Sequence, residues 1–175
     1  MSWYTDEQGR KRPITKRRRQ SYELPNLVIS SNVYKTISLD PTIFIHPTDL
    51  AYTLLVKDGL KSGSRISLKT SQRDKFEKFL TDNNILFVVE PSKYSSEYTI
   101  GRTKENIDRI LNSLGNTYEL GLALGYPESA VEYASKQNEF LGKRLFIYDP
   151  NDENASLIHK QWSNHLMNKY GISYD

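Results

Sequence analysis

The chain has 175 residues, of which 37% are hydrophobic and 26% are charged, and its net charge is +3. This composition is typical of a globular protein, and the length suits one domain with its own hydrophobic core. The chain contains no cysteine, which excludes disulfides, cysteine nucleophiles and cysteine-ligated metal sites.

The positive charge is concentrated near the amino terminus. Seven of the 24 Lys and Arg residues lie within positions 10–19, and only Asp6 and Glu7 precede them. Residues 1–19 therefore carry seven basic and two acidic groups, or +5, and the remainder carries 17 basic and 19 acidic groups, or −2. Such a segment repels itself and cannot bury an apolar face, and Pro13 excludes a helix across it. Residues 1–22 are therefore predicted to be a flexible, disordered basic tail.

Phosphate is the natural partner of this tail, because each Lys or Arg that neutralises a phosphate releases counterions and so favours binding to RNA or DNA. Targeting, binding to an acidic protein and simple solubilisation remain alternatives. The candidate nucleic-acid-binding residues are Arg10, Lys11, Arg12, Lys16, Arg17, Arg18 and Arg19.

The basic segment is not followed by an apolar run, so it lacks the features of a secretory signal. No apolar stretch approaches the ~18 residues that would span a bilayer. We therefore expect a cytoplasmic protein without membrane contact, or a nuclear one if the source is a eukaryote or a virus of eukaryotes.

After the tail, residues 24–30 and 33–39 are predicted as strands because they are rich in Val, Ile and Tyr. A short extended piece is expected at 42–46, between two prolines. A helix is predicted over 48–57, with Thr48 as its cap, and a half-buried strand over 65–69.

The next segment predicts a helix that begins near Ser71, because the spacing to Asp74 matches a capping box. The continuous apolar run at 85–89 suits a central strand, and 98–101 has the pattern of the end of another strand. The helical side chains expected to face the core are Phe76, Phe79 and Leu80.

A strand-to-helix turn is predicted at Gly101–Lys104, with Thr103 as the helix cap. Free amides at a helix start attract anions, so Arg102, Thr103 and Lys104 form a candidate anion-binding site. The buried stripe predicted for the helix that follows consists of Ile107, Ile110, Leu111 and Leu114.

Residues 118–124 and 127–140 predict a pair of helices. Gly121 would allow their close approach, Gly125 would supply a left-handed turn, and Val131 would fill the angle between them. The spacing resembles the helix-turn-helix of phage repressors over about twenty residues. That resemblance implies a major-groove face, in which two glutamates would be unfavourable near phosphates. Its residues would be Pro127, Glu128, Ser129, Glu132 and Tyr133.

The last elements are a predicted strand at 145–148 and a helix capped by Asn154, whose buried face would contain Trp162 and Leu166. No histidine pair has metal-site spacing, and the acidic stretch that starts at Asp149 departs from a calcium loop. Phosphate-loop, dinucleotide-binding and serine-elbow motifs are also absent from the sequence. We therefore predict neither a metal nor a cofactor.

Together these elements predict an α+β fold, with residues 23–175 as one compact domain that has a mixed or antiparallel sheet and about five helices. The leading functional hypothesis is a nucleic-acid-associated protein held on RNA or DNA by its basic arm. One alternative is a small enzyme or ligand-binding protein with an anion site at 101–104. Another is a viral or host regulatory module that binds a protein partner. No catalytic residue is identified.

Overall fold

A three-stranded antiparallel sheet is the centre of the fold. Its strands are β4 (Gly63–Lys69), β5 (Leu86–Glu90) and β6 (Ser95–Gly101), in the order β4-β6-β5. Along one row of the register, Arg65 lies opposite Thr99, which lies opposite Val88. The computed structural model describes residues 3–5, 11–13, 27–29, 39–139, 141–142 and 145–174.

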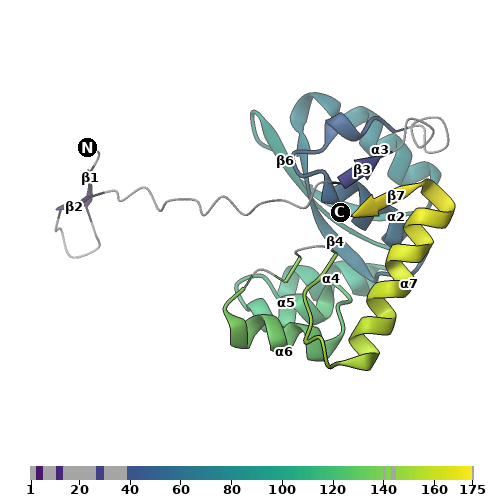
Figure 1. Cartoon of the computed structure of the whole chain (residues 1–175). Helices are drawn as coiled ribbons and strands as arrows, with labels where there is room; N and C mark the ends of the chain where they lie inside the picture. Colours follow the sequence, from purple (N-terminus) through teal and green to yellow (C-terminus); the bar gives the residue numbers. More distant parts are fainter. Residues whose placement is uncertain are drawn as a thin grey trace.

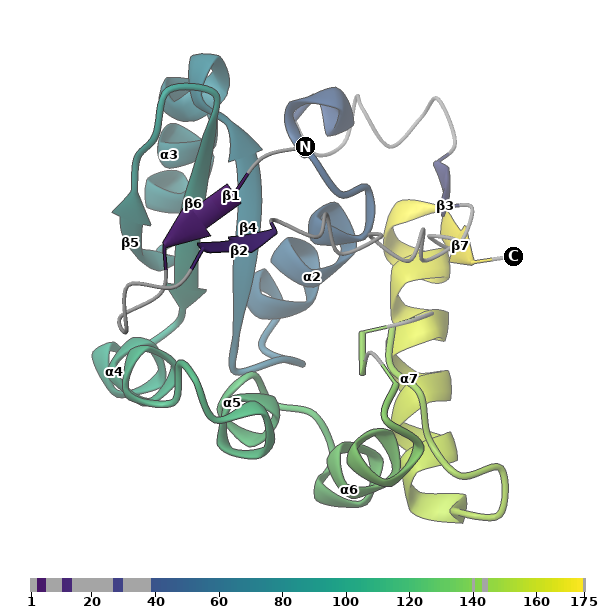
Figure 2. The ribbon, with the colours of Figure 1, turned by 90° about the vertical axis from the view of Figure 1, so that its left-hand side faces the viewer.

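Helices cover one face and one end of this sheet (Figures 1 and 2). Helices α2 and α3 lie on one face, α4, α5 and α6 form a layer at one end, and α7 runs beside α2 and reaches α6. This arrangement confirms the predicted α+β class and the antiparallel sheet, with six α-helices in the described residues in place of about five. The helices are α2 (Thr48–Lys57), α3 (Arg73–Asp82), α4 (Lys104–Asn112), α5 (Thr117–Ala123), α6 (Glu128–Gln137) and α7 (Glu153–Tyr170).

Short elements complete the described chain. Strand β1 (Trp3–Thr5) pairs with β2 (Lys11–Pro13), and β3 (Leu27–Ile29) pairs with β7 (Ile172–Tyr174), both antiparallel. Two 3-10 turns precede helices, at Pro41–Ile43 and Thr70–Gln72. The strand predicted over 24–30 is confirmed in its central part, while nearly all of the strand predicted over 33–39 lies outside the described residues.

The hydrophobic core lies between the sheet and the helices. Leu50, Leu54 and Leu55 of α2 are completely buried. Phe76 of α3 makes an edge-to-face contact with Tyr98 of β6, with ring centroids 5.0 Å apart. This burial and this ring contact fix α2 and α3 on the sheet.

The prediction that residues 85–89 form a central strand is wrong, because β5 is at the edge of the sheet. Its outward residues Leu86 and Val88 are 46% and 41% exposed. An apolar run alone does not distinguish an edge strand from a central one. The central strand is β6, which is more polar.

Three predicted helix caps are also wrong. Thr48 does not cap α2, because it is the first residue of that helix and the start of the helix has no side-chain cap. Ser71 and Asp74 form no capping box, since Ser71 is in a 3-10 turn and α3 begins at Arg73 without a side-chain cap. In α7 the cap is Asp152, whose side chain accepts a hydrogen bond from the Ala155 amide at 3.0 Å, and Asn154 lies inside the helix. Each Asx or Ser in such a cluster can cap, so spacing does not select one.

Residues 145–148 do not form the predicted strand. Leu145 has a φ of +75°, which is incompatible with an extended ladder. Leu145 and Phe146 are nevertheless buried, so the apolar pattern indicated burial correctly. Leu114 is 43% exposed and falls outside the buried stripe, because α4 ends at Asn112.

Candidate functional site

The predicted nucleic-acid-binding residues are only partly within the described chain. Lys11 and Arg12 belong to β2, whose register places Arg12 opposite Tyr4 and Lys11 opposite Thr5. The expectation of a wholly disordered tail is therefore not confirmed. The other candidates, Arg10, Lys16, Arg17, Arg18 and Arg19, lie outside the described residues.

The candidate anion site at Arg102, Thr103 and Lys104 is engaged in contacts within the chain. The Arg102 guanidinium donates to the carbonyl oxygen of Lys57, the last residue of α2, at 2.8 Å. The Thr103 hydroxyl accepts a hydrogen bond from the Asn106 amide, which confirms its predicted role as the cap of α4. The ammonium group of Lys104 lies 3.3 Å from Asp108. Arg102 therefore caps the carboxyl end of α2, and its binding to an external anion stays a prediction.

The predicted geometry of the helix pair is confirmed. A Cβ on Gly121 would lie 3.0 Å from both methyl carbons of Val131, so the glycine does allow α5 and α6 to approach closely. Gly125 has a φ of +85°, which is the left-handed turn conformation. Tyr118 donates a hydrogen bond to Glu128 at 2.8 Å, and this carboxylate raises the pKa of Tyr118 to about 12.

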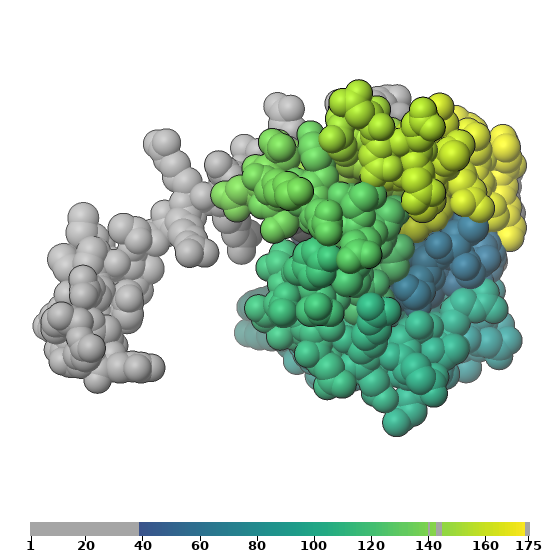
Figure 3. Space-filling view, turned by 90° about the horizontal axis from the view of Figure 1, so that it is seen from below, coloured from purple at the N-terminus to yellow at the C-terminus, as the bar shows by residue number. Residues whose placement is uncertain are grey.

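The side chains that would read a major groove lie on the outer side of this pair. Glu128, Ser129 and Glu132 are exposed, while Pro127 and Tyr133 are half-buried. Seen from below, residues of α4 to α6 make up most of one face of the molecule, with α7 at its border (Figure 3). DNA reading by this face stays a prediction.

A buried lysine, not foreseen from the sequence, occupies the junction between the sheet and the helix pair. Lys61 is 1% exposed, and its Nζ donates to the carbonyl oxygens of Gly63 and Leu124, both at 2.7 Å. The same nitrogen lies 4.4 Å from the ring centroid of Tyr126 and 5.2 Å from that of Tyr52. We call Lys61, these two carbonyls and the two rings the lysine cage.

Asp49 of α2 is a buried acid whose charge acts on Lys61. It is 6% exposed, and its Oδ2 accepts a hydrogen bond from the Ser67 amide at 2.9 Å. Burial raises the pKa of Asp49 to about 7, and burial lowers the pKa of Lys61 to about 7 against the opposing charge of Asp49. Both groups lie beneath the surface, so burial disfavours the charged form of each.

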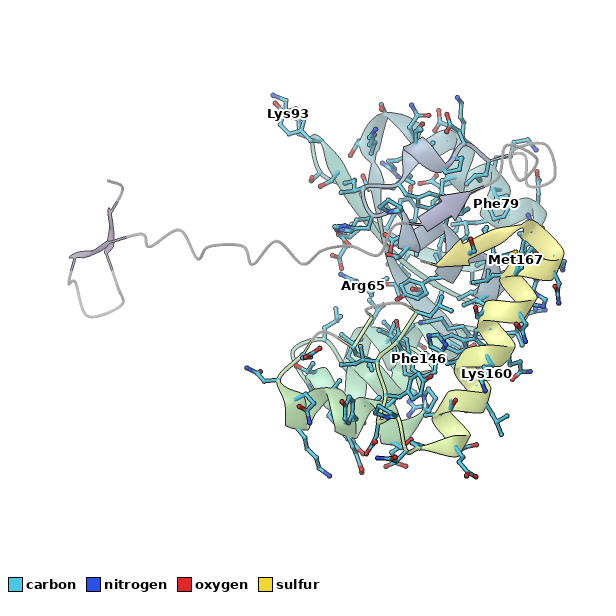
Figure 4. The ribbon with its side chains drawn as sticks, in the orientation of Figure 1. Arg65, Phe79, Lys93, Phe146, Lys160 and Met167 are labelled. Atoms are coloured by element: carbon cyan, nitrogen blue, oxygen red, sulfur yellow. The ribbon has the colours of Figure 1, made fainter. Side chains whose placement is uncertain are left out.

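Aromatic rings surround the lysine cage. The Tyr52 hydroxyl lies 2.9 Å from the carbonyl oxygen of Gly142 and 3.0 Å from that of Leu145. The Tyr126 ring makes contacts with Phe146 and Trp162, at centroid distances of 6.0 Å and 6.1 Å. Figure 4 shows Phe146 between the helix pair and α7. The lysine cage therefore lies where α2, the α5–α6 helix pair and α7 make contact.

A second polar cluster joins the ends of α2 and α7. Asp58 accepts hydrogen bonds from His165 at 2.8 Å, Lys169 at 2.8 Å and Tyr170 at 2.5 Å. Burial would raise the pKa of Asp58, but these donors and the charge of Lys57 hold it well below its ordinary value. We call this set the Asp58 cluster. The Asp58 cluster therefore gives His165 a charged partner.

Within the residues that the structure describes, no three acidic or histidine side chains are grouped so that they could hold a metal ion. In the same residues, no helix is both long and apolar enough to cross a bilayer. Comparisons of the chain with protein-family models, curated proteins and solved structures find no match. Function must therefore be argued from the residues themselves.

Proposed function

We propose that the protein associates with RNA or DNA through the basic arm at residues 10–19. The observation that carries this proposal is the division of charge. The seven basic residues of the arm give residues 1–19 a charge of +5, while the rest of the chain carries −2. Phosphate affinity should then come from the arm, because the remaining surface is weakly repulsive to a polyanion.

The pairing of β1 with β2 supports this proposal. It aligns a strand that contains Trp3 and Tyr4 with one that contains Lys11 and Arg12. Aromatic residues that stack on bases, combined with cations that neutralise phosphates, are typical of proteins that bind single strands. The contacts of Arg102 and Lys104 within the chain support the arm, and not the 101–104 turn, as the main phosphate contact.

Binding to mixed-sequence RNA and DNA at several salt concentrations tests the proposal. The full-length protein is compared with a variant in which all seven basic residues are replaced by Gln, which preserves the length of the arm. The logarithm of the binding constant should fall linearly with the logarithm of salt concentration, with a slope no steeper than about −6 for seven contacts. The Gln variant should lose most of this binding. Equal binding by both proteins, or no salt-sensitive binding by the full-length protein near ~50 mM salt, would overturn the proposal.

A paired substitution in α6 distinguishes the arm from the helix pair. Replacing Glu128 and Glu132 by Gln removes two negative charges from the face that resembles a recognition helix. If only the arm binds, affinity should change little; if α6 enters the major groove, affinity should rise because repulsion by phosphates is removed.

A further inference from the structure

The lysine cage is at a boundary between two parts of the fold. The sheet with α2 and α3 forms one part, and α4, α5 and α6 form the layer at its end (Figure 1). Lys61 belongs to the loop between α2 and β4, whereas Leu124 and Tyr126 belong to the turn between α5 and α6. The hydrogen bond from Lys61 to Leu124 therefore crosses this boundary.

Lys61 also satisfies backbone groups that would otherwise be left without donors. Leu124 is the C-cap residue of α5, where helix carbonyls have no partner in the helix and a cation is favourable. Gly63 is the first residue of β4. One side chain thus bonds the end of a helix in one layer and the start of a strand in the other.

Ser62, the residue after Lys61, also makes close contacts across this boundary. A Cβ on Gly125 would lie 2.5 Å from the Ser62 hydroxyl oxygen and 2.9 Å from the Ser62 amide nitrogen, so the two backbones touch. The Ser62 hydroxyl contacts the Ala123 carbonyl at 3.5 Å, the limit of a hydrogen bond. The 2.7 Å bond from Lys61 to Leu124 is a short polar link across this boundary, and the rings of Tyr52 and Tyr126 also make contact across it.

We propose that Lys61 is an internal latch that holds the α5–α6 helix pair on the sheet layer, and that breaking its hydrogen bonds lets the pair open as a unit while the sheet stays folded. Both an ammonium group and a neutral amine can donate two hydrogen bonds, so the latch holds in either protonation state. Opening would expose Tyr126 and the surface of Phe146 and Trp162 that it covers. The helix pair is then a movable element, with its own free energy of opening.

Hydrogen exchange tests the latch on the full chain. Lys61→Met keeps the length of the side chain and removes its donors, and Lys160→Met, at an exposed position of α7, is the matched control. In Lys61→Met the amides of α5 and α6 should exchange at least about tenfold faster than in the wild type, as expected for local opening. The amides of β4 and β6 should exchange at the wild-type rate. Unchanged α5–α6 exchange, or an equal increase in the sheet, would overturn the proposal.

Chemical rescue shows whether the amine itself is the link. Lys61→Ala lacks the atoms of n-propylamine, so added n-propylamine should slow α5–α6 exchange, and 1-propanol at the same concentration should not. Equal effects of the two compounds would contradict the latch. If neither variant folds, the wild-type protein decides the question in low denaturant. There the α5–α6 amides should open at lower free energy than those of β4 and β6, and a single shared free energy would overturn the proposal.

Discussion

The Nζ atom of Lys61 lies 2.7 Å from the carbonyl oxygen of Leu124, a residue 63 positions away in the sequence. This contact joins two layers of the fold through one buried side chain. Its neighbour Asp49 is also buried, and the two groups have pKa values displaced in opposite directions toward neutrality. Stability should therefore respond to pH through groups that solvent does not reach.

Asp49→Asn should remove a pH dependence of stability. In the folded chain the pKa of Asp49 is about 7, against 3.8 in its ordinary state. Between these values the folded state binds more protons than the unfolded state, so the free energy of unfolding falls as pH rises from about 4 to about 7, by at most ~1.4 kcal/mol per pH unit. Urea unfolding at several pH values should show this fall in the wild type and in exposed Asp74→Asn, and not in Asp49→Asn. If the free energy of unfolding fell equally with pH in all three proteins, Asp49 would not be the cause of the fall.

Asp58→Asn should destabilise the protein at neutral pH by roughly 1 to 3 kcal/mol, because Lys169, Tyr170 and His165 lose a shared charged acceptor. The folded-state pKa of Asp58 is lowered, so its contribution is present above the ordinary value of 3.8 and is lost as pH falls below it. The difference in melting temperature between wild type and variant should thus shrink in acid. Asp108→Asn, in an exposed ion pair with Lys104, is the control and should change stability little. A difference that is constant from neutral pH into acid would show that the carboxylate charge is not the cause.

Gly125→Ala should lower the free energy of unfolding more than Gly115→Ala does. Both glycines have positive φ values, +85° and +91°, so each substitution should carry backbone strain of about 1 kcal/mol. Only Gly125 would also press a Cβ against Ser62, whereas nothing lies within 4 Å of a Cβ on Gly115. Thermal unfolding should therefore show a further loss of roughly 1 to 3 kcal/mol for Gly125→Ala, as in other overpacked sites. Equal losses would mean that the turn relaxes away from Ser62.

Ile110→Ala should cost ~2 to 5 kcal/mol, because the side chain is completely buried in α4 and its removal leaves a cavity. Leu114→Ala is the control, since Leu114 is 43% exposed just beyond the end of the same helix. It should cost less than ~0.5 kcal/mol, as surface substitutions usually do. Denaturant unfolding of both variants measures the contrast, and similar losses would refute the assigned buried face.

Features that depend on sequence neighbours could be predicted. The Thr103 cap needs only the amide of Asn106, and the left-handed turn at Gly125 needs only the freedom of glycine. The close contact of Gly121 with Val131 follows from helical spacing across a short turn. Each of these signals lies within about ten residues.

Features that depend on the order of elements in space could not be predicted. Leu86 and Val88 have the pattern of a central strand, but the path of the chain puts β6 in the middle of the sheet. The burial of Lys61 could not be predicted, because Leu124 and Tyr126 come from a turn that follows three strands and three α-helices later. Arg102 likewise bonds the carbonyl oxygen of Lys57, 45 positions earlier, a contact that the local sequence does not indicate.

The pairing of β3 with β7 has a consequence for biosynthesis. Leu27 lies opposite Tyr174 and Ile29 lies opposite Ile172, so during translation β3 is made long before the strand with which it pairs. The pair can close only when both segments have left the ribosome, after the sheet and most helices have had time to form. Until then the edge of β3 has no β7 to pair with, and the nascent chain carries a strand that another molecule could capture.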